Sequence, residues 1–179
     1  FWGAPTPNER HAVACVRAAM DAQIAMELIN VKRREENKRR EAENVQRGAR
    51  GEEPLDLLAE LALGTGINTG TAIVGMMGSE AHIINYTIFG REVNLASRLE
   101  GVSGHSRIVI GEATFRDLEK HDLELGALCA ELEPVTPKGF STPIRIWEVP
   151  WKSFLPSGTP GVAKAEAAAA KSEKPAGAA

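Results

Sequence analysis

Residues 86–100 read YTIFGREVNLASRLE and carry the clearest structural signal in the chain. Its first four residues are β-branched or aromatic, the side chains that favour a strand. Gly90 then ends the strand, and Leu95 and Leu99 recur four residues apart, as on one face of a helix. A strand that leads at once into a helix over about residues 92–102 is therefore predicted, and Gly104 follows as the usual helix stop.

The helix in this stretch also carries a polar pair. Asn94 and Arg98 are four residues apart, so they share a helix face with a separation of about 6 Å along the axis. An amide beside a guanidinium is rich in hydrogen-bond donors, and the planar fork of arginine suits phosphate oxygens. A polar helix face, with Arg98 paired to a carboxylate such as that of Glu100, explains the same spacing, so spacing alone leaves both interpretations open.

The surrounding pattern mixes strands and helices. Thr71–Val74 and Ile83–Phe89 predict a β-hairpin, and partial alternation precedes it over residues 61–67. Later elements expected from the pattern are a strand at 107–110, a helix at 112–120, an ambiguous segment at 125–132 that fits a strand, and a strand at 144–149. This order predicts a domain of the α+β class.

The N-terminal part predicts a long helix. It begins near Asn8, a suitable N-cap, and apolar residues recur every three or four positions from Val13 through Leu28 to Val31. Residues 32–41 are then a run of mixed charge, which favours a solvated helical extension. A coiled-coil or nucleic-acid arm is disfavoured because the charges nearly cancel and no apolar heptad seam is present. Gly48 and Gly51 end the run, and no internal repeat is recognised.

Composition bounds the class of protein. The chain has 179 residues, of which 43% are hydrophobic and 25% charged, with a net charge of −3. These values fit one globular domain, expected to be cytoplasmic, and lack the basic footprint of a nucleic-acid-binding protein. No apolar run approaches a membrane span. The segment 156–179 is rich in Ala, Gly, Pro and Lys and is expected to be a disordered tail.

Cysteine and histidine give no site. Cys15 and Cys129 are far apart and outside any CxxC spacing, which indicates neither a metal motif nor a disulfide framework. The four histidines share no metal-binding spacing and are interpreted as structural or solvated: His11, His82, His105 and His121.

Three linked motifs carry a family resemblance. Residues 66–70 (GINTG), 74–80 (VGMMGSE) and 86–100 stand in the order and at the spacing of the class III adenylate/guanylate cyclase catalytic domain. Over residues 1–150, the chain resembles the C-terminal part of that domain, and it is most like the domain of bacterial adenylate cyclases. The charged stretch 32–55 resembles an insertion into it. The resemblance implies a ferredoxin-like antiparallel sheet with helices on one face and without its first strands.

The resemblance also implies roles for individual residues. Asn94 matches the asparagine that positions the ribose, and Arg98 the arginine that stabilises charge on the α-phosphate. Thr87 falls where the family contacts the purine, and its hydroxyl suits an adenine edge. Lys138 falls where the family has a lysine for the terminal phosphates, although its Pro-rich surroundings are unusual. The implied reaction converts ATP to 3′,5′-cyclic AMP and pyrophosphate in signal transduction, with two Mg²⁺ or Mn²⁺ ions.

Part of the family's site is absent from these 179 residues. The two metal-binding aspartates and the purine-selecting lysine of the family correspond to positions upstream of Phe1, so no metal ligand is expected in this chain. In the family the site forms between two subunits, so a homodimer or a partner cyclase subunit is expected to complete it, and this chain alone is expected to be inactive. Arg91 stands where many relatives have Asp or Asn and cannot cap the helix in the same way.

Two other functions stay open at this point. The missing aspartates fit a non-catalytic regulatory or dimerisation module, whereas guanylate cyclase activity is disfavoured by Thr87. A full-length parent with a sensory or membrane region upstream is expected from the resemblance, so the whole protein can be membrane-tethered even where this segment is not.

Overall fold

The structure is a computed structural model that describes residues 1–78 and 84–159. It divides into two units, the first formed by Phe1–Gln23 with Ala62–Trp151, and the second formed by Ile24–Leu61 with the chain from Lys152 onward. The predicted tail from residue 160 and His82 lie outside the described residues. No helix within the described ranges is both long and apolar enough to cross a membrane.

The first unit is built on a four-stranded sheet. Its strands, in spatial order, are β1 (Thr65–Ile67), β4 (Ile108–Gly111), β6 (Ile144–Glu148) and β5 (Ala130–Val135). β1 and β4 are parallel, whereas β4 with β6 and β5 with β6 are antiparallel. The α+β class with a mostly antiparallel sheet is thus confirmed.

The expected hairpin forms a separate two-stranded sheet. β2 (Ile73–Met77) and β3 (Asn85–Phe89) pair antiparallel, with Ile73 opposite Phe89 and Gly75 opposite Thr87. The alternation over residues 61–67 yields a shorter strand than expected, since β1 begins only at Thr65 and residues 61–64 are not part of it.

The decisive helix forms as expected. α2 (Arg91–Ser103) starts directly after β3 and ends at Gly104, which has a positive φ of 65°. Leu95 and Leu99 are buried and pack in one cluster with Val109 of β4 and Ile146 of β6. This burial fixes which face of α2 turns toward the sheet, and it leaves the polar face outward.

The segment 125–132 corrects an expectation. After α3 (Glu112–His121), a short helix α4 (Leu123–Leu128) precedes β5, so the first half of the segment is helical rather than extended. The side chain of Asp122 accepts a hydrogen bond from the backbone N–H of Leu125 and so caps α4. The expectation of a strand rested on the pattern of apolar residues, and that pattern does not reveal a helix that a polar cap such as Asp122 starts.

The long helix α1 (His11–Ala49) belongs to both units. It starts close to Asn8, whose side-chain oxygen accepts from the Arg10 N–H at 2.9 Å. Val13, Val16 and Met20 are buried as the apolar stripe predicts, but Leu28 is 40% exposed, which contradicts the expectation that the stripe continues to Val31.

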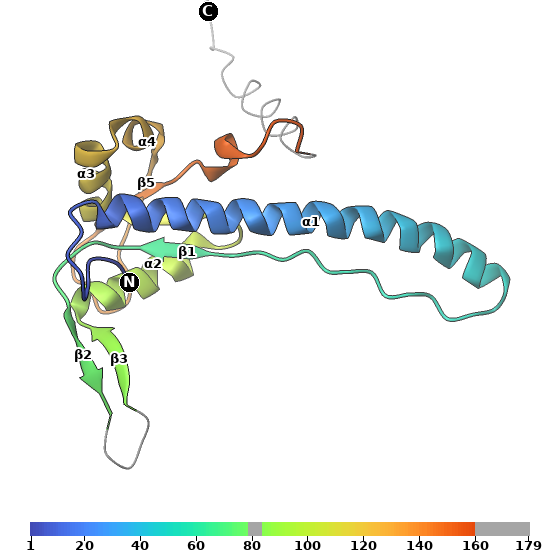
Figure 1. Cartoon of the computed structure of the whole chain (residues 1–179), viewed down its shortest axis with the longest axis horizontal. Helices are drawn as coiled ribbons and strands as arrows, with labels where there is room; N and C mark the ends of the chain where they lie inside the picture. The colour runs from blue at the N-terminus through green and yellow to red at the C-terminus, as the bar shows by residue number, and fades with distance from the viewer. Residues whose placement is uncertain (79–83, 160–179) are drawn as a thin grey trace, which may run out of the picture. The chain divides into compact units, whose positions relative to one another are not determined.

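The second unit corrects another expectation. An extended segment returns alongside the second half of α1 (Figure 1), and polar side chains at a seven-residue spacing contact it. Asn30, Asn37 and Asn44 form this repeat, which corrects the expectation that the chain has no internal repeat. The apolar pattern misses it because the repeated side chains are polar.

The last helical element among the described residues is a 3₁₀ turn, η1 (Trp151–Phe154).

Candidate active site on helix α2

The predicted polar pair lies on the outer face of α2. Asn94 and Arg98 are both exposed, one helical turn apart, at about 6 Å along the axis. Neither side chain makes a hydrogen bond or ion pair with any residue in 1–78 or 84–159, so the alternative of an internal pair between Arg98 and Glu100 is not observed. Both groups are therefore available to an external ligand.

The start of α2 lacks a side-chain cap. Gly90 is the N-cap residue at φ 148°, where a side chain is disfavoured, and it makes no side-chain cap bond. Arg91 instead pairs with the Glu92 carboxylate at 3.2 Å, and its guanidinium lies 4.8 Å from the ring centroid of Phe140. Arg91 thus occupies the first helical position rather than the capping position, and the helix start is uncapped because its N-cap residue, Gly90, has no side chain.

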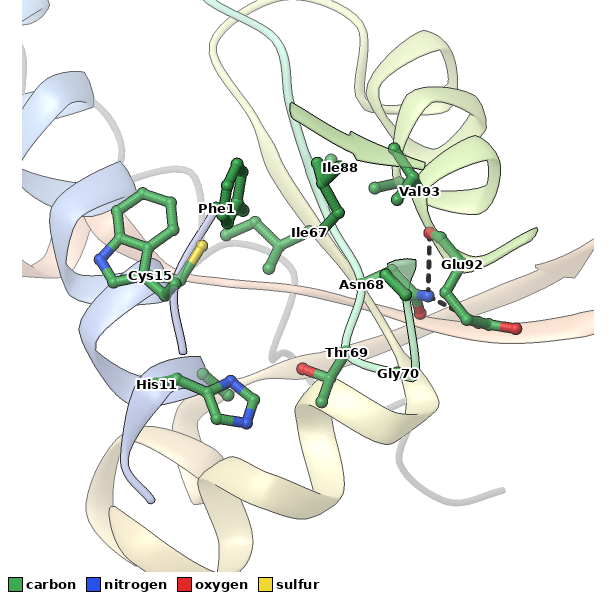
Figure 2. Close-up of a pocket in the computed structure, with 15 residues that line it drawn as sticks. Phe1, His11, Cys15, Ile67, Asn68, Thr69, Gly70, Ile88, Glu92 and Val93 are labelled. Carbon is green, nitrogen blue, oxygen red and sulfur yellow. Dashed lines mark hydrogen bonds between the residues drawn. The ribbon is translucent and has the colours of Figure 1, made fainter. Parts of the chain in front are cut away.

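Asn68 supports this helix start from the loop after β1. Its side-chain N–H₂ donates to the Glu92 carboxylate at 2.8 Å and to the Glu92 carbonyl at 3.3 Å (Figure 2). Thr69, the next residue, shares a 3.0 Å hydrogen bond with Thr114 of α3. The loop therefore ties the first turn of α2 to the body of the first unit.

Replacing Asn68 with alanine is expected to destabilise the fold by about 1–3 kcal/mol, because the half-buried Glu92 carboxylate loses its amide donor. Chemical denaturation measures the change in the free energy of unfolding. Asn94→Ala is the matched control, since the exposed Asn94 side chain has no partner among the described residues, and it should stay within about 0.5 kcal/mol of the parent. Equal effects of the two substitutions would contradict this role of Asn68.

The other two predicted residues lie on the elements next to α2. Thr87 is half-buried on β3, opposite Gly75, and β3 runs directly into α2. Lys138 is exposed in the turn between β5 and β6, which closes with a 3.0 Å bond from the Phe140 N–H to the Pro137 carbonyl. Because Arg91 lies over Phe140, the Lys138 turn is next to the start of α2.

A separate cavity of about 290 Å³ lies in the first unit (Figure 2). Its wall is largely apolar and comes from distant segments, represented by Phe1, Cys15, Ile67 and Val93. None of Thr87, Asn94, Arg98 and Lys138 lines it. Burial raises the pKa of Cys15 to about 11, so its thiol is protonated and unreactive at neutral pH. Since none of these four residues lines it, the cavity is not the phosphate-binding site that the sequence predicts, although residues 66–70, one of the three sequence motifs, form part of its wall.

The described residues do not form a metal site. Within residues 1–78 and 84–159, no three His, Cys, Asp or Glu side chains are grouped so that they could hold a metal ion. The polar pair on α2 consists of an amide and a cation, and a guanidinium does not bind a metal ion. The residues present therefore do not fit the two ions that the resemblance implies.

Comparison with known proteins agrees with this geometry. Residues 1–139 match the family model described as the adenylate and guanylate cyclase catalytic domain. Adenylate cyclase 1 of Rhizobium meliloti is 33% identical over 154 residues, which cover 83% of this chain and 19% of that protein. This chain thus spans about a fifth of the length of that relative.

Solved structures give the same result. The adenylyl cyclase CyaB from P. aeruginosa is 29% identical, with a TM-score of 0.58 over 83% of this chain and 64% of that one. The guanylyl cyclase Cya2 is 28% identical, with a TM-score of 0.55 over 83% of this chain and 62% of that one. The sequence motifs, the sheet and these matches together establish that the chain belongs to the adenylate and guanylate cyclase catalytic domain family.

Proposed function

We propose that this chain supplies one half of an adenylate cyclase active site, which converts ATP to 3′,5′-cyclic AMP and pyrophosphate in signal transduction. The observation that carries the proposal is the exposed pair Asn94 and Arg98, held one turn apart on a helix whose opposite face is buried. The 33% identity to adenylate cyclase 1 of R. meliloti supports adenylate chemistry, whereas the two solved structures do not distinguish the nucleotides, since CyaB is 29% and the guanylyl cyclase Cya2 28% identical.

The chemistry assigns each residue a task. The ribose 3′-oxygen attacks the α-phosphorus in line, forms the new P–O bond and displaces pyrophosphate. The Arg98 guanidinium donates to the α-phosphate oxygens, where negative charge increases in the transition state. Asn94 donates to the ribose and orients the attacking oxygen. Thr87 contacts the adenine edge, and Lys138 binds the terminal phosphates.

The remaining groups come from a second subunit in this proposal. Since the described residues offer no metal-binding cluster, the acidic residues that hold the metal ions belong to a homodimeric partner with further sequence or to another cyclase subunit. The 179 residues alone are then inactive. The same observation favours one alternative, a regulatory or dimerisation module that pairs with a cyclase without turnover.

Complementation distinguishes these two functions. The chain is mixed with a class III cyclase subunit that retains its metal-binding aspartates but has its helix arginine replaced by alanine, and pairing is shown by analytical ultracentrifugation. Cyclic AMP, identified by chromatography, is expected from the mixture and from neither chain alone. Pairing without cyclic AMP would reject the catalytic proposal in favour of the regulatory module.

Thr87→Cys is expected to lower the preference for ATP over GTP about tenfold in this mixture, because a thiol is a weaker donor and acceptor than the hydroxyl that meets the adenine edge. The measurement is the ratio of kcat/KM for the two nucleotides. Thr71→Cys, a threonine that precedes β2, provides the control and should leave the ratio unchanged. An unaltered ratio in Thr87→Cys would show that this side chain does not contact the base.

A further inference from the structure

The second unit contains a repeat of polar residues along α1. Asn30, Asn37 and Asn44 are spaced by seven, and an arginine follows each of them three residues later, at Arg33, Arg40 and Arg47. In a helix, positions i, i+3 and i+7 lie along one stripe. The stripe occupies the two positions of a heptad that are apolar in a coiled coil.

Each asparagine binds the backbone of the extended segment twice. The Asn30 amide donates to the Leu61 carbonyl at 2.7 Å, and its oxygen accepts the Leu61 N–H at 2.8 Å. Asn37 binds Leu58 in the same way, at 2.8 and 2.7 Å. Asn44 binds Leu55 at 2.9 and 2.6 Å. Every side-chain amide thus pairs with one residue's N–H and C=O.

The arginines add a second row of bonds to the same backbone. Arg33 donates to the Ala59 carbonyl at 2.6 Å, Arg40 to the Asp56 carbonyl at 2.6 Å, and Arg47 to the Glu53 carbonyl at 2.7 Å. These carbonyls are again three residues apart. Neither row uses a side-chain atom of the extended segment, so the recognition depends on the backbone.

The two spacings agree because of elementary chain geometry. Seven helical residues advance by about 10.5 Å at 1.5 Å each. Three extended residues advance by about 9–10 Å at 3.1–3.4 Å each. A seven-residue step along the helix therefore meets a three-residue step along the extended segment, and the match repeats from Asn30 to Asn44 without slipping.

We infer that this stripe of α1 is a binding site for an extended polypeptide backbone, with one asparagine and one arginine per heptad for every three residues of ligand. Residues 53–61 of the chain itself occupy the site. Since the two rows bind only backbone groups, they accept whichever residue lies at the right distance along the segment. The bond from Arg34 to the Glu60 carboxylate at 2.8 Å reaches a side chain of the segment, but Arg34 belongs to neither row. The inference does not rest on the proposed cyclase activity.

Hydrogen exchange followed by NMR on the 179-residue chain tests the pairing. The amides of Leu55, Leu58 and Leu61 are expected to be protected, and the amides between them, which bond to no described residue, should exchange at least about tenfold faster. Asn37→Ala should release Leu58 about tenfold, whereas Lys38→Ala, an exposed neighbour, should not. Uniform exchange across the segment, or protection of Leu58 that survives Asn37→Ala, would overturn the inference.

Two deletions test the dependence on backbone distance. Deleting residues 37–43 together with 56–58 removes one seven-residue and one three-residue step, so Asn44 should still protect Leu55. Deleting residues 37–43 alone places Asn44 opposite Leu58, so protection should move from Leu55 to Leu58. Protection of Leu55 in both variants would show that the number of steps from Asn30 does not set the pairing, and loss of protection from Leu55 in the first variant and from both Leu55 and Leu58 in the second would show that the repeat is not a unit. Either result would overturn the inference.

Discussion

Gly66→Ala is expected to destabilise the first unit by about 4 kcal/mol or more, which is comparable with the whole stability of many domains. A Cβ at this position would lie 2.0 Å from the Glu100 nitrogen and 2.5 Å from the Ala96 carbonyl oxygen. Both atoms belong to the backbone of α2, so no side chain can rotate to make room. Relief requires that β1 and α2 separate, which breaks the packing of Leu99.

Gly75→Ala is the matched control for this substitution. Gly75 also lies in a strand, β2, but a Cβ there meets no atom within 4 Å. Its effect is expected to be below about 1 kcal/mol. Chemical denaturation of the two variants gives the comparison, and equal midpoints would contradict the close packing of β1 against α2.

Arg98→Ala is expected to lower cyclic AMP formation about 10²–10³-fold in the mixed-subunit assay, because in the proposed reaction it removes the donors that stabilise the developing charge on the α-phosphate. Arg98→Lys should recover only part of the rate, since an ammonium keeps the charge but lacks the planar fork. The folding stability should hardly change, because the Arg98 side chain is exposed and bonds to nothing within the described ranges.

Arg116→Ala is the control for the loss of an arginine. Arg116 lies on α3, is exposed and pairs with Glu112 four residues away. Its replacement should leave the rate of cyclic AMP formation within about twofold, as for a surface ion pair remote from the reaction. If Arg98→Ala retained the parent rate, the assignment of Arg98 to the α-phosphate would be wrong.

The sequence predicted the parts of this fold that local patterns encode. Leu95 and Leu99 placed α2 because their spacing reflects burial on one helix face. The helical start of segment 125–132 was missed because it depends on the Asp122 cap, which does not alter the apolar pattern. The asparagine repeat is not visible in the apolar pattern either. Its partners are backbone N–H and C=O groups, which every residue has, so the sequence does not show which part of the chain lies beside the repeat.

Part of the candidate site could likewise be predicted from local sequence spacing, and part depends on the tertiary structure. Asn94 and Arg98 could be placed together from a spacing of four on one helix. The proximity of the Lys138 turn to α2 could not, because it depends on contact between Arg91 and Phe140 across 49 positions of sequence. Asn68 was overlooked because its function is to hold Glu92, which only the folded loop after β1 reveals.

Two deficient partner subunits together test whether this chain supplies the helix half of a shared active site. One cyclase subunit lacks its helix arginine and the other lacks its metal-binding aspartates, and each is mixed with this chain at equal pairing. Cyclic AMP should form with the arginine-deficient subunit alone, because in the proposed function this chain contributes Asn94 and Arg98, whereas residues 1–78 and 84–159 contain no acidic cluster that could hold a metal ion. Rescue of the aspartate-deficient subunit, or rescue of neither, would contradict the account.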